Sequence, residues 1–318
     1  MNSGSEPAAS PGASGEPADS AKVARRATSA GLEALFRQAW EDYESTLKAR
    51  FPELLMRVLE GMARETVAGE VVLWHLYNAG WVVVADSVAV GMDVALMADL
   101  GATQQAREAL FGALDALLIT HQHADHCYEG DVAVWADLGR PLLVCHPDTA
   151  RVLTRRGVPE KQVFGLEAGE STTIGGLRVQ ALPANHRHRD IPNCIAFAAT
   201  LGGFTIVHTG DNRLFGPPAL QGAEEADVLI HSLYAYDEAQ AREGALTWVP
   251  EMLDEQARFL ADLRPRVVLL THLAEFYHPY HKLWRFVHAA LLKERLFHLA
   301  PEVECPILGP GERYVYRR

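Results

Sequence analysis

The chain has 318 residues, of which 48% are hydrophobic and 22% are charged, so it can bury a substantial core as one large domain with extensions. Its formal net charge of −12 disfavours a surface that holds nucleic acid non-specifically, because phosphate binding needs a clustered excess of lysine and arginine. Widely spaced cysteines without a C-x-x-C pair, and the lack of a membrane-length apolar run, favour a reduced, cytoplasmic protein over an exported or membrane-inserted one.

The amino-terminal segment, residues 1–27, consists mainly of Ser, Ala, Pro, Gly and Glu, with almost no large apolar side chain. Such a composition cannot bury enough surface to offset its ordering entropy, so we predict a disordered tail. Apolar residues then recur at helical spacing, and Pro52 stands where a second helix would begin. We therefore predict a helical extension over residues 28–68, in two helices, ahead of a main domain over residues 69–318.

The main domain begins with a strand-rich stretch over residues 70–93. Valine, leucine and tryptophan dominate it, and the short turns at residues 78–80 and 86–87 divide it into three strands. Helical spacing follows over residues 104–114. The next apolar run, residues 116–119, is short and flanked by polar residues, which is typical of a buried strand.

This apolar run leads into Thr-His-Gln-His-Ala-Asp-His, residues 120–126, so its histidines and aspartate emerge where the strand ends. Imidazole nitrogen and carboxylate oxygen are ligands of first-row divalent metals. Such groups, clustered at a strand terminus, would repel one another or stay unsatisfied without a cation to neutralise them. We therefore predict a metal site here. Its candidate ligands are His121, His123, Asp125 and His126.

Beyond this loop, helical and strand-like segments alternate up to about residue 275. Four of the apolar strands in this part run into a histidine or an aspartate, an arrangement that core packing does not predict. These residues are His186, Asp211, His231 and His272. A helix over residues 283–297 and a strand within residues 305–316 are predicted to close the chain.

The pattern His-x-His-x-Asp-His at residues 121–126 resembles the signature of the metallo-β-lactamase superfamily. The resemblance covers residues 70–275, about two thirds of the chain. It implies an α/β fold, the αββα four-layer sandwich, with a site at one edge of its two sheets and an added N-terminal helical segment. Residues 69–318 would then form the hydrolase domain.

Carried over residue by residue, the resemblance implies a dinuclear metal centre. His121, His123 and His186 would bind one ion, with His188 as the alternative to His186. The second ion would be bound by Asp125, His126 and His272, and Asp211 would bridge the two. The cofactors would be two divalent metal ions, with zinc the first choice and manganese or iron the alternatives.

The superfamily also implies supporting roles. An acidic residue at the end of an early strand would support the metal loop, with Asp93 the first candidate and Asp86 the second. Asp125 and Asp211, ionised, would partly neutralise the cations and fix the nucleophile. His231 would donate the proton that the leaving group needs.

Two branches of the superfamily are most similar in these motifs. The tRNA 3′-processing endonucleases share the strand-end motifs of the carboxyl-terminal half, but they place Glu after the histidine equivalent to His231, where this chain has Ser232. The ascorbate-phosphate lactonase-like branch, which hydrolyses small molecules, shares the segment from residue 80 to 93 and Pro-Ala-Asn-His at residues 183–186. True β-lactamases are disfavoured, because Asp211 stands where many of them have a cysteine ligand.

We therefore predict a hydrolase that uses a metal-bridging hydroxide to cleave a small ester, lactone or phosphodiester. The alternatives are an RNA or DNA phosphodiesterase of the tRNA 3′-processing type and a di-iron protein that reduces oxygen or nitric oxide on the same fold. A module whose metals only hold the fold is disfavoured, because a structural zinc site needs only four protein ligands. The expected partner is a small molecule and not a membrane. Nucleic acid is disfavoured, and homo-oligomer formation is left open.

Overall fold

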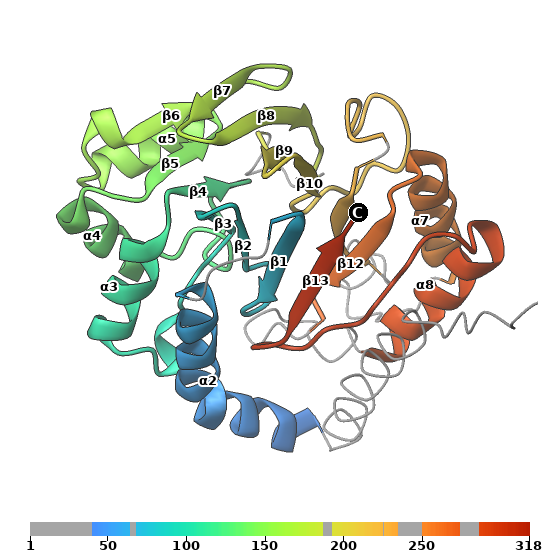
Figure 1. The fold of residues 1–318 in the computed structure, drawn as a ribbon, viewed down its shortest axis with the longest axis horizontal. Helices are drawn as coiled ribbons and strands as arrows, with labels where there is room; N and C mark the ends of the chain where they lie inside the picture. Colours follow the sequence, from blue (N-terminus) through green and yellow to red (C-terminus); the bar gives the residue numbers. More distant parts are fainter. Residues whose placement is uncertain (1–39, 64–67, 187–192, 225, 235–249, 274–285) are drawn as a thin grey trace, which may run out of the picture.

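The computed structural model describes residues 40–63, 68–186, 193–224, 226–234, 250–273 and 286–318. Two sheets face each other, with helices α2 to α5 on the outer side of one sheet and helices α7 and α8 on the outer side of the other (Figure 1). The predicted αββα sandwich is thus confirmed. The predicted tail, residues 1–27, lies outside the described residues, and so does His188.

The first sheet has seven strands in the order β13-β1-β2-β3-β4-β5-β6. Its strands β3 to β6 are parallel, so their carboxyl ends lie at one edge. The strands are β1 (Glu70–His75), β2 (Trp81–Ala85), β3 (Val88–Met92), β4 (Ala116–Ile119), β5 (Leu142–Cys145), β6 (Val163–Gly165) and β13 (Arg313–Arg317).

The second sheet has six strands in the order β12-β11-β10-β9-β8-β7. Strands β10, β11 and β12 are parallel to one another, which brings three strand ends together. The strands are β7 (Ser171–Ile174), β8 (Leu177–Pro183), β9 (Ile195–Leu201), β10 (Phe204–His208), β11 (Val228–Ser232) and β12 (Val267–Thr271).

The helices cover the outer faces of both sheets. They are α2 (Trp40–Met62), α3 (Gln104–Ala113), α4 (Glu129–Leu138), α5 (Pro147–Arg155), α7 (Pro250–Leu263) and α8 (Phe286–Leu299), with 3-10 turns η1 (Ala98–Leu100) and η2 (Glu160–Gln162). Three clusters of buried apolar residues fill the spaces between the four layers, one between the sheets and one beneath each helical layer. In the part of the chain that the structure describes, no helix has the length and apolarity needed to cross a membrane.

Helix α2 corrects one prediction, because it runs through Pro52 without a break. A proline inside a helix removes one hydrogen bond and costs about 3 kcal/mol. An apolar stripe continues across the proline and is buried in the core beneath the first sheet. Its members are Tyr43, Leu47, Phe51, Leu55 and Val58. Burying a side chain of this size contributes about 1.5–3 kcal/mol, so the packing of the stripe outweighs the local cost.

Candidate metal centre

The candidate ligands meet because parallel strands from both sheets end at the same edge of the sandwich. Strand β4 leads into the 120–126 loop, and strands β10 and β12 lead into Asp211 and His272. The backbone N–H of Ile195, at the start of β9, donates to the carbonyl of Thr120 at 3.2 Å. This bond joins the loop that follows the first sheet to the second sheet, so both sheets position the candidate ligands.

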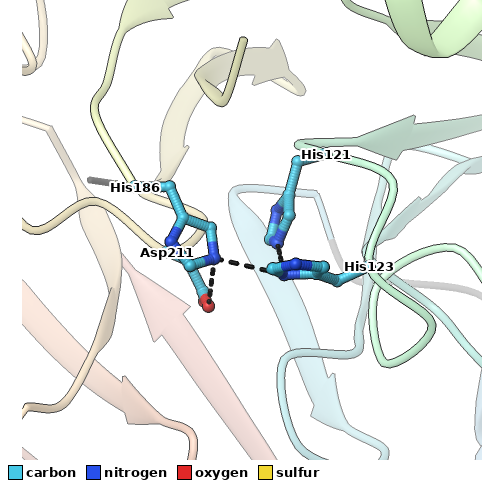
Figure 2. A group of neighbouring side chains, drawn as sticks. All are labelled: His121, His123, His186 and Asp211. Atoms are coloured by element: carbon cyan, nitrogen blue, oxygen red, sulfur yellow. Dashed lines mark hydrogen bonds and ion pairs between the residues drawn. The ribbon is translucent and has the colours of Figure 1, made fainter. Parts of the chain in front are cut away.

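The first donor group consists of His121, His123, His186 and Asp211, whose candidate ligand atoms all lie within 4.8 Å of one another. Figure 2 shows the four side chains turned toward a common point. His121 Nε2 and His186 Nε2 lie 2.9 and 3.2 Å from His123 Nδ1. These separations suit several nitrogen ligands around one small cation.

The second donor group consists of Asp125, His126 and His272, again with ligand atoms within 4.8 Å of one another. Asp125 Oδ2 lies 3.2 Å from His126 Nε2 and 3.5 Å from His272 Nε2. All seven residues named from the sequence therefore gather in two adjacent groups.

Asp211 faces both groups with different oxygens. Its Oδ2 lies 3.4 Å from His186 Nε2, while its Oδ1 lies 3.3 Å from His126 Nε2 and 3.0 Å from His272 Nε2. A carboxylate can bind two ions in this way, one through each oxygen.

Burial and charge make the groups strongly interdependent. Burial alone would lower the pKa of His126, but the carboxylates of Asp125, Asp93 and Asp211 outweigh it and hold that pKa well above its usual range. Burial likewise opposes protonation of His272, yet Asp211 and Asp125 raise its pKa to about 9. Burial and the nearby His126 keep the pKa of His121 well below its usual value.

These pKa shifts favour positive charge between the buried carboxylates at the second donor group. Burial would raise the pKa of Asp211, but His272 and His126 keep it well below the usual range, so the carboxylate stays ionised. Divalent cations can supply this positive charge in place of protons. The nitrogen and oxygen donors fit zinc, manganese or iron.

Asp93 contacts the loop of residues 120–126 through both of its carboxylate oxygens. Its Oδ1 accepts from Thr120 N at 2.8 Å, and its Oδ2 accepts from Thr120 Oγ1 at 2.7 Å and lies 2.7 Å from His126 Nδ1. A hydrogen bond at Nδ1 leaves Nε2 of His126 free to bind a metal. Asp86, the second candidate from the sequence, is exposed in the turn between β2 and β3. Asp93, the first candidate, is therefore the one in contact with a candidate ligand, His126.

Ser232 has a role that sequence reasoning missed, because it was recognised only as a departure from a family pattern. Its hydroxyl donates to the carbonyl of Gly210 at 2.7 Å and lies 3.1 Å from His272 Nδ1. Since the hydroxyl proton goes to Gly210, the Ser232 oxygen can accept from Nδ1–H of His272. That contact leaves His272 Nε2 facing the donor group.

His231 lies on the opposite face of β11 from Ser232, because neighbouring residues of a strand alternate. It is fully buried, and its Nε2 lies 3.3 Å from Oε1 of Gln256 on α7. Burial lowers the pKa of His231 to about 4. The proton-donor role stays a prediction, and the contacts with α7 favour a packing role instead.

The substitution His231→Ala separates these two roles. A proton donor would lose turnover by about 10²–10⁴-fold, with the greater loss for poor leaving groups. Because the ring packs on Gln256, we expect instead a similar, smaller loss for good and poor leaving groups, and a fall in melting temperature of about 2–4 °C per kcal/mol lost. Kinetics on a substrate series, with thermal melts, check this. A loss that grows as the leaving group worsens would restore the proton-donor role.

Comparison with known proteins finds the same superfamily over most of the part of the chain that resembles it. A family model described as "Beta-lactamase superfamily domain" matches residues 74–273. A UPF0173 metal-dependent hydrolase of Thermococcus kodakarensis is 33% identical over 110 residues, which are 33% of this chain and 47% of that protein. The matched part of the chain therefore spans about half the length of this relative.

Solved structures with the same fold include Igni18, described as a metallo hydrolase from Ignicoccus hospitalis. It has a TM-score of 0.60 at 19% identity and covers 78% of this chain and 99% of its own. CmlA, a diiron β-hydroxylase from Streptomyces venezuelae, has a TM-score of 0.56 at 16% identity and covers 80% of this chain and 55% of its own. At these identities the likeness is one of fold.

Proposed function

Because this chain belongs to the beta-lactamase superfamily, we propose that it is a metal-dependent hydrolase whose strand-end site holds two metal ions. The observation that carries the proposal is Asp211, whose two oxygens face two separate donor groups. The name of the Thermococcus kodakarensis relative, a metal-dependent hydrolase, supports the reaction class.

Each of the two donor groups would hold one metal ion. His121, His123 and His186 would hold one ion. Asp125, His126 and His272 would hold the other, and Asp211 would lie between them. Ions of this kind supply an ionised water as nucleophile near neutral pH and polarise the bond to be cleaved.

The chain's own residues would prepare that site. The carboxylates of Asp125 and Asp211 offset part of the metal charge, and the buried histidines keep their ring nitrogens in place. Asp93 and Ser232 hold the outer nitrogens of His126 and His272, so the inner nitrogens point at the site without reorganisation.

The substrate we propose is a small ester, lactone or phosphodiester in a cytoplasmic setting. A nucleic-acid phosphodiester is less supported, because the chain is acidic and Ser232 replaces the glutamate of the tRNA 3′-processing pattern. A di-iron redox function is the second candidate, since both donor groups are made of nitrogen and oxygen and CmlA carries two irons on this fold.

Metal analysis combined with an activity panel tests the proposal. We expect close to two first-row ions per chain, no visible absorption, and hydrolysis of at least one chromogenic ester, lactone or phosphodiester, abolished by a chelator. Zinc is colourless and ferric pairs are coloured, so absorbance separates hydrolase from di-iron protein. A folded protein that holds at most one ion in metal-replete buffer would contradict the two-metal site.

A further inference from the structure

Asn78, in the turn between β1 and β2, touches the second donor group from a part of the chain that supplies no ligand. We propose that Asn78 is a positioning residue that sets how tightly the group Asp125, His126 and His272 holds its metal ion. The inference rests on the proposed two-metal function and names a residue that sets the affinity of the second metal position.

The side chain of Asn78 acts on Asp125. Its Nδ2 donates to Asp125 Oδ2 at 2.7 Å, and this oxygen is the one nearest both His126 Nε2 and His272 Nε2. A hydrogen bond to an ionised carboxylate is stronger than one between neutral groups. The bond therefore fixes the orientation of the carboxylate before a metal binds, which removes an entropic cost from binding.

The backbone of Asn78 acts on His272. Its carbonyl accepts from the hydroxyl of Thr271 and from the backbone N–H of His272 at 3.4 Å. The same carbonyl lies 3.0 Å from His75 Nε2, which anchors the turn to the end of β1. One residue thus holds a ligand from the first sheet through its side chain and a ligand from the second sheet through its main chain.

The residue type fits this position and no general packing need explains it. Asn78 has a φ of 50°, in the left-handed region that asparagine tolerates better than most residues. It is 1% exposed, yet its Oδ1 is buried without a hydrogen-bond partner among the described residues. A buried acceptor left in this way lowers the stability of the folded protein. The amide is therefore poorly placed for stability, and its one side-chain hydrogen bond there goes to a metal ligand.

Metal titrations of full-length Asn78→Gly and Asn78→Ala test the inference. Both variants remove the amide, but glycine adopts the left-handed backbone without strain, whereas alanine is strained there. We expect both to weaken the second ion about 10–100-fold and to leave the first ion unchanged. Only the alanine variant should also lose melting temperature from strain, so equal affinities with unequal stabilities would assign the effect to the amide.

The readout is stepwise zinc affinity by competition with a chelating indicator. His126→Ala, which removes a donor of the second group, identifies the step that belongs to it. Ser87→Gly is the matched control, because Ser87 has a φ of 66° in the exposed turn between β2 and β3. It should leave both steps unchanged.

Two results would overturn the inference in different ways. If wild-type protein binds two ions and the Asn78 variants bind both as tightly, or lose both steps equally, Asn78 has no selective role while the two-metal function stands. If wild-type protein binds only one ion, the proposed function fails and this inference fails with it.

Discussion

The Asp211→Asn protein is expected to hold nearer one metal ion than two, with turnover reduced by at least about 10²-fold. Each oxygen of Asp211 faces a different donor group, so the carboxylate shares its charge between both. The substitution keeps the size of the side chain but replaces a charged oxygen by an amide NH₂, which cannot bind a cation. Repulsion between the two cations is then less offset, and the weaker one dissociates.

Elemental analysis after gel filtration checks this stoichiometry. Excess metal should restore occupancy before it restores turnover, because the position of the nucleophile depends on the bridge. Asp254→Asn is a matched control, since Asp254 belongs to neither donor group and forms a partly exposed ion pair with Arg295. It should keep both ions. Two tightly bound ions and near-normal turnover in Asp211→Asn would refute the bridging role.

The grouping of the candidate ligands was predictable because each directly follows a strand or lies in the loop after one. A short apolar run that ends in a cluster such as His121 to His126 carries its own signal, and the same device recurs at Asp211 and His272. The fold then needs only parallel strands with their ends at one edge. Local sequence and strand direction together explain why the seven candidates meet.

The contacts that Asn78 and Ser232 make with the candidate ligands were not predictable in the same way. Asn78 lies 47 residues from Asp125 in the chain. An Asn-Ala-Gly turn does not indicate which distant carboxylate its side chain will contact. In the sequence, Ser232 was interpreted only as standing in place of the glutamate of a family pattern. Its contact with His272 was not predicted. Such contacts depend on how the sheets face each other, which the strand pattern does not specify.

The proton-donor role of His231 stays a prediction, and the structure adds one fact about its position. It ends an apolar run as the ligands do, but β11 continues to Ser232, so alternation turns the histidine toward α7. A shift of one residue in the strand end therefore changes which face of the sheet a side chain lies on. The prediction of two helices around Pro52 was wrong, because the burial of the apolar stripe of α2 overrides the local preference of the proline.

The Asp93→Asn protein is expected to fold and yet to lose most of its second metal ion. In the native chain Asp93 Oδ2 lies 2.7 Å from His126 Nδ1, so Nδ1 keeps its hydrogen when a metal ion replaces the proton at Nε2. Asparagine can still accept from Thr120 N through its oxygen, but its NH₂ then faces Nδ1. Two donors cannot face each other, so His126 must move its hydrogen to Nε2, the atom that should bind the ion.

The expected loss of affinity at the second donor group is at least about 10–100-fold, the range found when partners of metal-binding histidines are removed. Nitrogen NMR reports the tautomer of His126, and metal analysis reports the number of ions bound. The two methods therefore test the tautomer change and the loss of metal separately. Asp86→Asn is the control, because Asp86 is exposed in a neighbouring turn and should change neither. If Asp93→Asn keeps the native tautomer and both ions, the carboxylate serves only to pack the loop. Asp93→Ala should then cost stability alone, since it leaves the buried N–H of Thr120 without its acceptor.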